Sequence, residues 1–168
     1  MKIGKPKKFS FVELGPGNGA FCKTFCNTLK KFPEFEKSVK IYLLEKSEKL
    51  IKTQKNLIKD KNVIWIKNLN QVNNGPAIFF GNEFFDSIPI KQFEVKKSKI
   101  FEKFIQIKKG KFNKFFLKRT SKKILRKLAE LNLLKTKKVI EYPEKGLKIL
   151  ELIAKKIQKI GGGILLID

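Results

Sequence analysis

The chain of 168 residues is long enough for one domain with a substantial core, and hydrophobic residues make up 42% of it. It has no histidine, which excludes histidine-based catalytic triads and most zinc sites. Its formal charge of +24 comes almost entirely from lysines spread along the sequence, a pattern that favours a basic surface over base recognition by arginine. No apolar run reaches transmembrane length and no signal-peptide core is present, so we expect a soluble intracellular protein.

The first predicted element is a buried strand over residues 9–14 that runs into a glycine-rich loop. Gly15, Gly17 and Gly19 take alternate positions there, so the turn is too tight for side chains and leads to a helix N-terminus with free N–H groups. Glu13 comes just before the glycines. Its carboxylate would repel a pyrophosphate, and the glycine spacing is not the dinucleotide fingerprint. A ligand with a positive centre, such as a sulfonium, therefore fits this loop better.

The helix that follows the loop is predicted to end at Pro33 and to present one apolar face. That face carries Phe21, Phe25, Leu29 and Phe32. Cys22 and Cys26 lie in the same helix and are expected to be buried free thiols of a reducing compartment. A strand over 41–44, a helix with Ser47 as its N-cap, and strands over 63–66 and 77–80 come next. This alternation predicts an α/β fold with a parallel sheet covered by helices on both faces.

The pattern changes at residue 90. From 90 to 117 apolar and polar residues alternate more loosely, and two or three antiparallel strands fit best, as a β insertion beside the main sheet. Ser121 is a candidate cap for one helix, and a second helix is predicted after Pro143. Glycines 161–163 end that helix, and residues 164–168 form a fifth strand. We interpret the chain as a single domain over 1–168 that contains the insertion 90–117.

Polar side chains gather at the predicted carboxyl ends of the strands, where ligands bind in open α/β sheets. Besides Glu13, these are Glu45, Asn82 with Glu83 and Asp86, and Asp168. Glu45 stands 30 positions after Gly15, where a carboxylate can accept hydrogen bonds from both hydroxyls of a ribose. No phosphate-binding lysine motif follows the glycines, so we predict a nucleoside ligand with a positive centre. S-adenosylmethionine fits this description better than NAD.

Three segments, 13–19, 75–79 and 82–90, resemble successive motifs of the MidA-type class I S-adenosylmethionine-dependent methyltransferases. Residues 141–143 and 161–168 resemble later blocks of the same family, which includes the mitochondrial complex I assembly-factor protein arginine methyltransferase. The resemblance implies a Rossmann-like fold, S-adenosyl-L-methionine as cofactor, and a protein arginine as methyl acceptor. Family members extend before the glycine loop and beyond Asp168. The sequence is therefore expected to be an incomplete domain that lacks the last strands, with one edge of its fifth strand unpaired and prone to aggregation.

Two groups of residues are assigned to the predicted site. The cofactor-binding group is Glu13, Gly15, Gly17, Gly19, Glu45 and Asn82. An arginine acceptor is cationic, so carboxylates must bind its guanidinium and orient its nitrogen, and Glu83, Asp86 and Glu141 are the candidates. Two alternatives stay open: a nucleic-acid methyltransferase that uses the high positive charge, and a non-catalytic assembly module that keeps the fold. We expect the bacterial cytoplasm as location, or the mitochondrial matrix if the source is eukaryotic.

Overall fold

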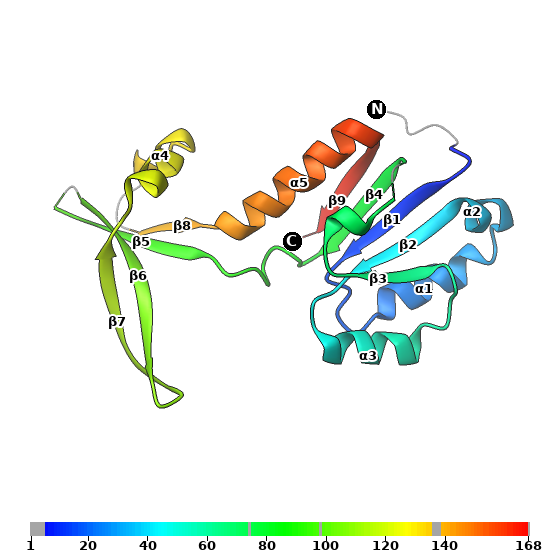
Figure 1. Ribbon diagram of the computed structural model, residues 1–168, viewed down its shortest axis with the longest axis horizontal. Helices are drawn as coiled ribbons and strands as arrows, with labels where there is room; N and C mark the ends of the chain where they lie inside the picture. The colour runs from blue at the N-terminus through cyan, green and yellow to red at the C-terminus, as the bar shows by residue number, and fades with distance from the viewer. Residues whose placement is uncertain (1–5, 74, 98, 136–138, 168) are drawn as a thin grey trace. The chain divides into compact units, whose positions relative to one another are not determined.

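The computed structural model describes residues 6–73, 75–97, 99–135 and 139–167 (Figure 1). It divides into two compact units. The first comprises Met1–Ser87 and Lys148–Asp168, and the second comprises Ile88–Leu147. None of the described helices is long and apolar enough to cross a membrane.

The first unit is built on a five-stranded parallel sheet in the order β3-β2-β1-β4-β9. Its strands are β1 (Phe9–Leu14), β2 (Val39–Leu44), β3 (Val63–Ile66), β4 (Ala77–Asn82) and β9 (Gly162–Ile167). From β1 the chain adds β2 and β3 on one side and then returns to add β4 on the other. This reversal makes the carboxyl ends of β1 and β4 the topological switch point, where ligands bind in open α/β sheets.

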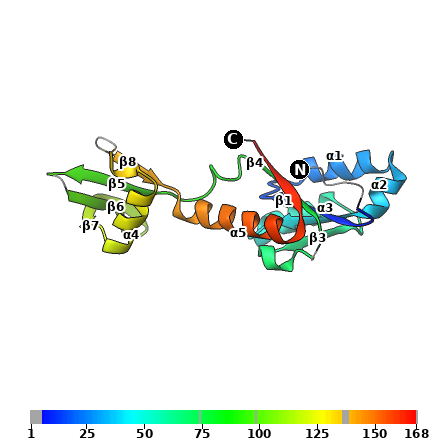
Figure 2. The ribbon, with the colours of Figure 1, turned by 90° about the horizontal axis from the view of Figure 1, so that it is seen from above.

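Helices cover both faces of this sheet, so the predicted α/β fold is confirmed (Figure 2). Its helices are α1 (Ala20–Leu29), α2 (Pro33–Ser38), α3 (Glu48–Leu57), the 3-10 turn η1 (Leu69–Gln71) and the part of α5 (Glu144–Ile160) from Lys148 onward. On one face, Cys22 and Cys26 of α1 pack against Phe11 and Ile41. On the other face, Ile153 of α5 packs in one cluster with strand residues such as Val12 and Phe79.

The second unit is a four-stranded antiparallel sheet in the order β7-β6-β5-β8 with one α-helix packed on it. Its elements are β5 (Lys91–Lys96), β6 (Lys99–Lys108), β7 (Lys111–Arg119), α4 (Lys122–Glu130), the 3-10 turn η2 (Leu133–Lys135) and β8 (Val139–Tyr142). The unit is larger than the insertion predicted over 90–117. The short strand β8 was missed, although its buried Ile140 and Tyr142 alternate with exposed Val139 and Glu141.

Two serine caps and two cysteines lie where the sequence predicts them. Ser47 and Ser121 are N-caps, with side chains that accept hydrogen bonds from backbone N–H groups three residues on. Cys22 and Cys26 are buried free thiols, with Sγ atoms 3.9 Å apart. The two predicted caps and the predicted burial of both cysteines are confirmed.

The predicted end of the first helix was wrong. Helix α1 stops at Leu29, and Pro33 begins α2 instead of ending α1. Proline is favoured at the first position of a helix, because its missing N–H group has no intrahelical partner there. Phe21 and Phe32, predicted on the buried face, are exposed.

The fifth strand begins at Gly162, two residues earlier than predicted. A Cβ atom at Gly162 would lie 1.8 Å from the carbonyl oxygen of Ala77, so only glycine allows β9 to approach β4 this closely. Asp168, predicted at the end of this strand, lies outside the described residues.

Candidate functional site

The glycine-rich loop between β1 and α1 depends on backbone conformations that favour glycine. Gly15, Gly17 and Gly19 all have positive φ angles, of 62°, 56° and 86°. A Cβ atom at Gly15 would lie 2.8 Å from Cδ2 of Phe84, whereas a Cβ atom at Gly17 would have no neighbour within 4 Å among the described residues. Gly15 therefore lets the loop pack against the turn after β4, and Gly17 leaves its outer side open to a ligand.

A hollow of about 420 Å³ lies at the carboxyl ends of β1, β4 and β9, and we call it the glycine-loop hollow. This volume is within the range of small-molecule sites. Its walls are formed by Glu13, Leu14, Gly15, Pro16, Gly17, Asn18, Phe21, Phe80, Asn82 and Ile167. The structure therefore brings together Glu13, Gly15, Gly17 and Asn82 from the predicted cofactor group, at the switch point of the sheet.

Glu13 is the most unusual side chain of the hollow. It is only 4% exposed, and its Oε2 is buried without a hydrogen-bond partner among the described residues. Burial away from water disfavours the charged form and raises the pKa of this carboxyl to about 7. An unpaired buried acceptor is costly, and a cationic or hydrogen-donating ligand in the hollow would remove that cost.

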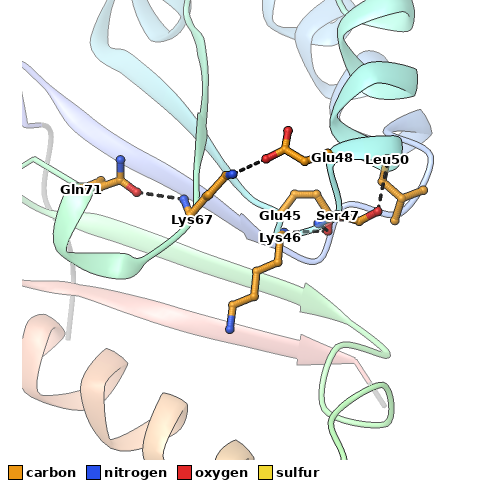
Figure 3. A network of polar contacts seen from close by, with 7 residues as sticks. All are labelled: Glu45, Lys46, Ser47, Glu48, Leu50, Lys67 and Gln71. Carbon is orange, nitrogen blue, oxygen red and sulfur yellow. Dashed lines mark hydrogen bonds and ion pairs between the residues drawn. The ribbon is translucent and has the colours of Figure 1, made fainter.

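Glu45, at the end of β2, is held by the protein itself (Figure 3). Its Oε1 accepts hydrogen bonds from the backbone N–H groups of Lys46 and Ser47, each at 2.8 Å. Its Oε2 accepts a third, from Nε2 of Gln54 at 3.3 Å. A carboxylate offers about four lone-pair positions, so about one remains for a ligand. The same figure shows the ion pair between Glu48 and Lys67 beside this turn.

Gln54 of α3 connects the glycine loop to β2 and β3, and it was not predicted from the sequence. It is fully buried, and its Nε2 also donates to the carbonyl oxygen of Gly17 at 2.7 Å. Its Oε1 accepts a hydrogen bond from Nε1 of Trp65 at 2.9 Å. One signal was present in the sequence, because Gln54 is a polar residue on the helix face that Leu50, Ile51, Leu57 and Ile58 make apolar.

The three predicted acceptor-binding carboxylates are all exposed. Glu83 and Asp86 lie in the turn that follows β4, and the backbone N–H of Glu83 donates to the carbonyl oxygen of Ile167 at 2.7 Å. Glu141 lies on β8 in the second unit, where its Oε1 accepts a hydrogen bond from Nε2 of Gln92 at 2.9 Å. The structure thus places two of the three candidates directly after a strand that borders the glycine-loop hollow.

A parallel sheet with a glycine-rich turn after β1, an acid after β2 and a hollow at the switch point defines a Rossmann-like, nucleoside-binding class of protein. A match to a known family identifies the kind of protein within this class. Residues 1–168 match the family described as "Putative S-adenosyl-L-methionine-dependent methyltransferase", and the chain belongs to that family. The resemblance to MidA-type methyltransferases is thereby confirmed.

Relatives in animals carry the name protein arginine methyltransferase NDUFAF7, mitochondrial. The Caenorhabditis elegans homolog is 34% identical over 110 residues, which cover 54% of this chain and 25% of that protein. The Danio rerio protein is 23% identical over 191 residues, covering 100% of this chain and 45% of that protein. The chain therefore spans less than half the length of these relatives.

One solved structure with a similar fold is a candidate methyl transfer enzyme from Burkholderia thailandensis bound to S-adenosyl-homocysteine. Its TM-score is 0.64 at 17% sequence identity, and the match covers 87% of this chain and 38% of that one. A second structure from the same organism, a native crystal structure of a COG1565 superfamily protein, gives a TM-score of 0.67 at 16% identity. At this level of identity the likeness concerns the fold.

Proposed function

We propose that this chain forms the cofactor-binding part of an S-adenosylmethionine-dependent methyltransferase that acts on an arginine of a protein. The observation that carries the proposal is the buried Oε2 of Glu13, which has no hydrogen-bond partner in the part of the chain that the structure describes, in a glycine-loop hollow large enough for a small molecule. A negatively charged acceptor in this position fits a ligand with a positive centre. Membership of the methyltransferase family and the names of the animal relatives support the same reading.

The residues of the first unit fit the cofactor in distinct ways. Glu13 would interact with a positive centre, and the open side of Gly17 would let the ligand approach the backbone. Asn82 lines the same hollow with a side-chain donor and acceptor. The remaining lone pair of Glu45 would accept one ribose hydroxyl, fewer than the two predicted from the sequence, because Gln54 and two backbone groups already use the others. Gly19 shapes the start of α1.

When bound, S-adenosylmethionine supplies a methyl group on a sulfonium, activated for direct displacement. The protein then has to place a nucleophile in line with it, and positioning of this kind provides much of the rate. Glu83 and Asp86 are exposed carboxylates in the turn after β4. In this proposal they bind the guanidinium of the acceptor and would take up the proton that its nitrogen releases as the methyl group is transferred. Glu141 is a further candidate for the same task, from the second unit.

Calorimetric titration of the 168-residue chain with S-adenosylmethionine tests the cofactor assignment. Glu13→Gln keeps the size of the side chain and removes its charge, and we expect about tenfold weaker binding or more, since a hydrogen bond to a charged group contributes about 1.5–3 kcal/mol. Glu34→Gln makes the same change on exposed α2 and should leave the affinity unchanged. Equal affinity of the wild type and Glu13→Gln would refute the role of Glu13.

The acceptor assignment needs a separate measurement, with a radiolabelled methyl donor and an arginine-containing protein substrate. Glu83→Gln and Asp86→Asn should keep the cofactor affinity and lose most of the transfer, because both side chains are exposed and outside the lining of the hollow. Full transfer by both variants would show that the acceptor binds elsewhere.

A further inference from the structure

The β6–β7 hairpin of the second unit presents two different faces. Residues paired directly across an antiparallel ladder share a face, and Phe93 pairs with Glu102 and Val95 with Ile100. Phe93 packs on Leu128 of α4, so the even-numbered residues of β6 lie on the face that α4 covers. The odd-numbered residues of β6 lie on the opposite face, which we call the open face.

The open face carries a continuous group of exposed apolar side chains. Ile105 pairs with Phe115, and Ile107 pairs with Phe112 across an irregularity in the ladder. These four side chains are 61%, 55%, 66% and 60% exposed, respectively. The rings of Phe112 and Phe115 lie 5.0 Å apart, as expected for neighbours on one face. Single exposed apolar residues are normal, whereas a contiguous patch marks an interaction site.

The charge of the β6–β7 hairpin that carries this patch is almost entirely positive. Residues 99–119 contain seven lysines, one arginine and a single carboxylate, Glu102. Lys108 and Lys111 pair directly with each other beside the turn, and Nζ of Lys103 lies 4.5 Å from the ring centre of Phe115. Two such surfaces repel each other, so a second copy of this chain is a poor occupant. An acidic partner is electrostatically complementary.

Strand β7 is also one of the two edge strands of the described sheet, at the opposite end from β8. In an antiparallel sheet every second residue of an edge strand directs its N–H and C=O groups away from its neighbour, and these groups can pair with another extended chain. Strand addition of this kind takes its affinity from the backbone and its specificity from alternate side chains. The edge therefore favours an extended peptide segment as the occupant.

We propose that the β7 edge and the open face bind an extended, acidic segment of a partner protein with apolar side chains at alternate positions. The apolar side chains lie against Phe112 and Phe115, and the carboxylates lie near Lys111 and Lys114. A bilayer surface would leave the edge groups of β7 without partners. Single-stranded nucleic acid uses stacked aromatic platforms, whereas these two rings are tilted by 56° and their two apolar neighbours are isoleucines. The proposal does not depend on the methyl-transfer function.

Fluorescence anisotropy with a labelled peptide of alternating glutamate and valine tests this surface on the 168-residue chain. We expect binding that weakens with salt, and a loss of about tenfold or more in the double variant Phe112→Ser/Phe115→Ser. Lys111→Glu/Lys114→Glu should weaken binding to a similar degree. The matched control Lys37→Glu/Lys52→Glu makes the same charge change on exposed positions of the first unit and should have little effect.

A second peptide, N-methylated at alternate amides, separates strand addition from side-chain contact alone. It keeps every side chain and loses the backbone donors, so we expect it to bind at least about tenfold more weakly. Circular dichroism confirms that each variant keeps its fold. Equal binding of the N-methylated peptide would overturn the proposal. The proposal would also be overturned if polyuridylate or phosphatidylserine vesicles bound more tightly than the peptide and the same variants lost that binding.

Discussion

Glu13 allows a quantitative prediction about stability as well as binding. Burial raises the pKa of its carboxyl from 4.5 to about 7 in the folded protein, so the folded state holds this proton over a pH window in which the unfolded chain has lost it. Stability falls with rising pH wherever the folded state binds more protons. Each unit of pKa corresponds to about 1.4 kcal/mol, so the ionisation of Glu13 should cost about 3 kcal/mol once the pH exceeds the folded-state pKa.

Denaturant unfolding at a series of pH values, for the wild type and Glu13→Gln in parallel, isolates this contribution. Glutamine does not titrate, and the other carboxylates affect both proteins alike, so the difference between the two free energies of unfolding reports on Glu13. Cys22 of α1 interacts electrostatically with Glu13, but the contact with Cys26 and burial raise the pKa of its own thiol, so this thiol stays protonated over the range. We expect the wild type to lose about 3 kcal/mol relative to the variant as the pH rises from about 4 to about 8.

A difference that stays constant across this range would refute the reasoning, because it would mean that Glu13 titrates alike in the folded and unfolded states. A difference that changes in the opposite direction would mean that an undetected partner stabilises the charged form. With saturating S-adenosylmethionine, the pH dependence should shrink, since a positive centre near Glu13 lowers its pKa again.

Two glycine substitutions have matched controls in the same chain. Gly17→Val should abolish S-adenosylmethionine binding in calorimetry by filling the open side of the loop, while Gly110→Val, also at a positive φ with no neighbour within 4 Å, should leave binding intact. Gly162→Ala should lower the free energy of unfolding by about 2 kcal/mol or more, because its Cβ would meet the backbone of β4. Gly163→Ala, with no atom within 4 Å, should change stability much less.

The main sheet could be predicted because its signals are local. Each strand of the first unit is a short apolar run, and the serine caps of α3 and α4 act on N–H groups three residues away. The glycine loop was equally clear, since Gly15, Gly17 and Gly19 all need positive φ angles. Such features depend on neighbours in sequence, so they can be inferred without knowledge of the tertiary contacts.

The missed features depend on contacts between distant segments. Strand β8 has four residues, and its pairing with β5 joins positions such as Phe93 and Ile140 that lie far apart in the chain. The surroundings of Glu45 follow from a hydrogen bond to Gln54, which no spacing rule specifies. The role of Pro33 was misassigned because proline occurs both after the end of a helix and at the first position of one. Here the non-helical backbone of Phe32, the N-cap of α2, makes Pro33 the start of a helix.

The hydrogen bonds of Gln54 imply that the shape of the glycine loop depends on a residue outside the hollow. Its amide joins the carbonyl oxygen of Gly17, Oε2 of Glu45 and Nε1 of Trp65. Gln54→Leu keeps the bulk and removes all three bonds, and because the groups left unpaired cost about 1–3 kcal/mol each, we expect a loss of several kcal/mol in denaturant unfolding.

A double-mutant cycle shows whether this loss comes from the polar network or from altered packing. Trp65→Phe deletes the N–H donor that Gln54→Leu leaves unpaired. Trp65→Phe should therefore lower the free energy of unfolding less in the Gln54→Leu background than in the wild type, by about 1 kcal/mol or more. Strict additivity of the two changes would contradict the network. If the network is real, Gln54→Leu should also weaken S-adenosylmethionine binding although Gln54 does not line the hollow. The reason is that Gly17 and Glu45 would lose a side chain that hydrogen-bonds to both of them.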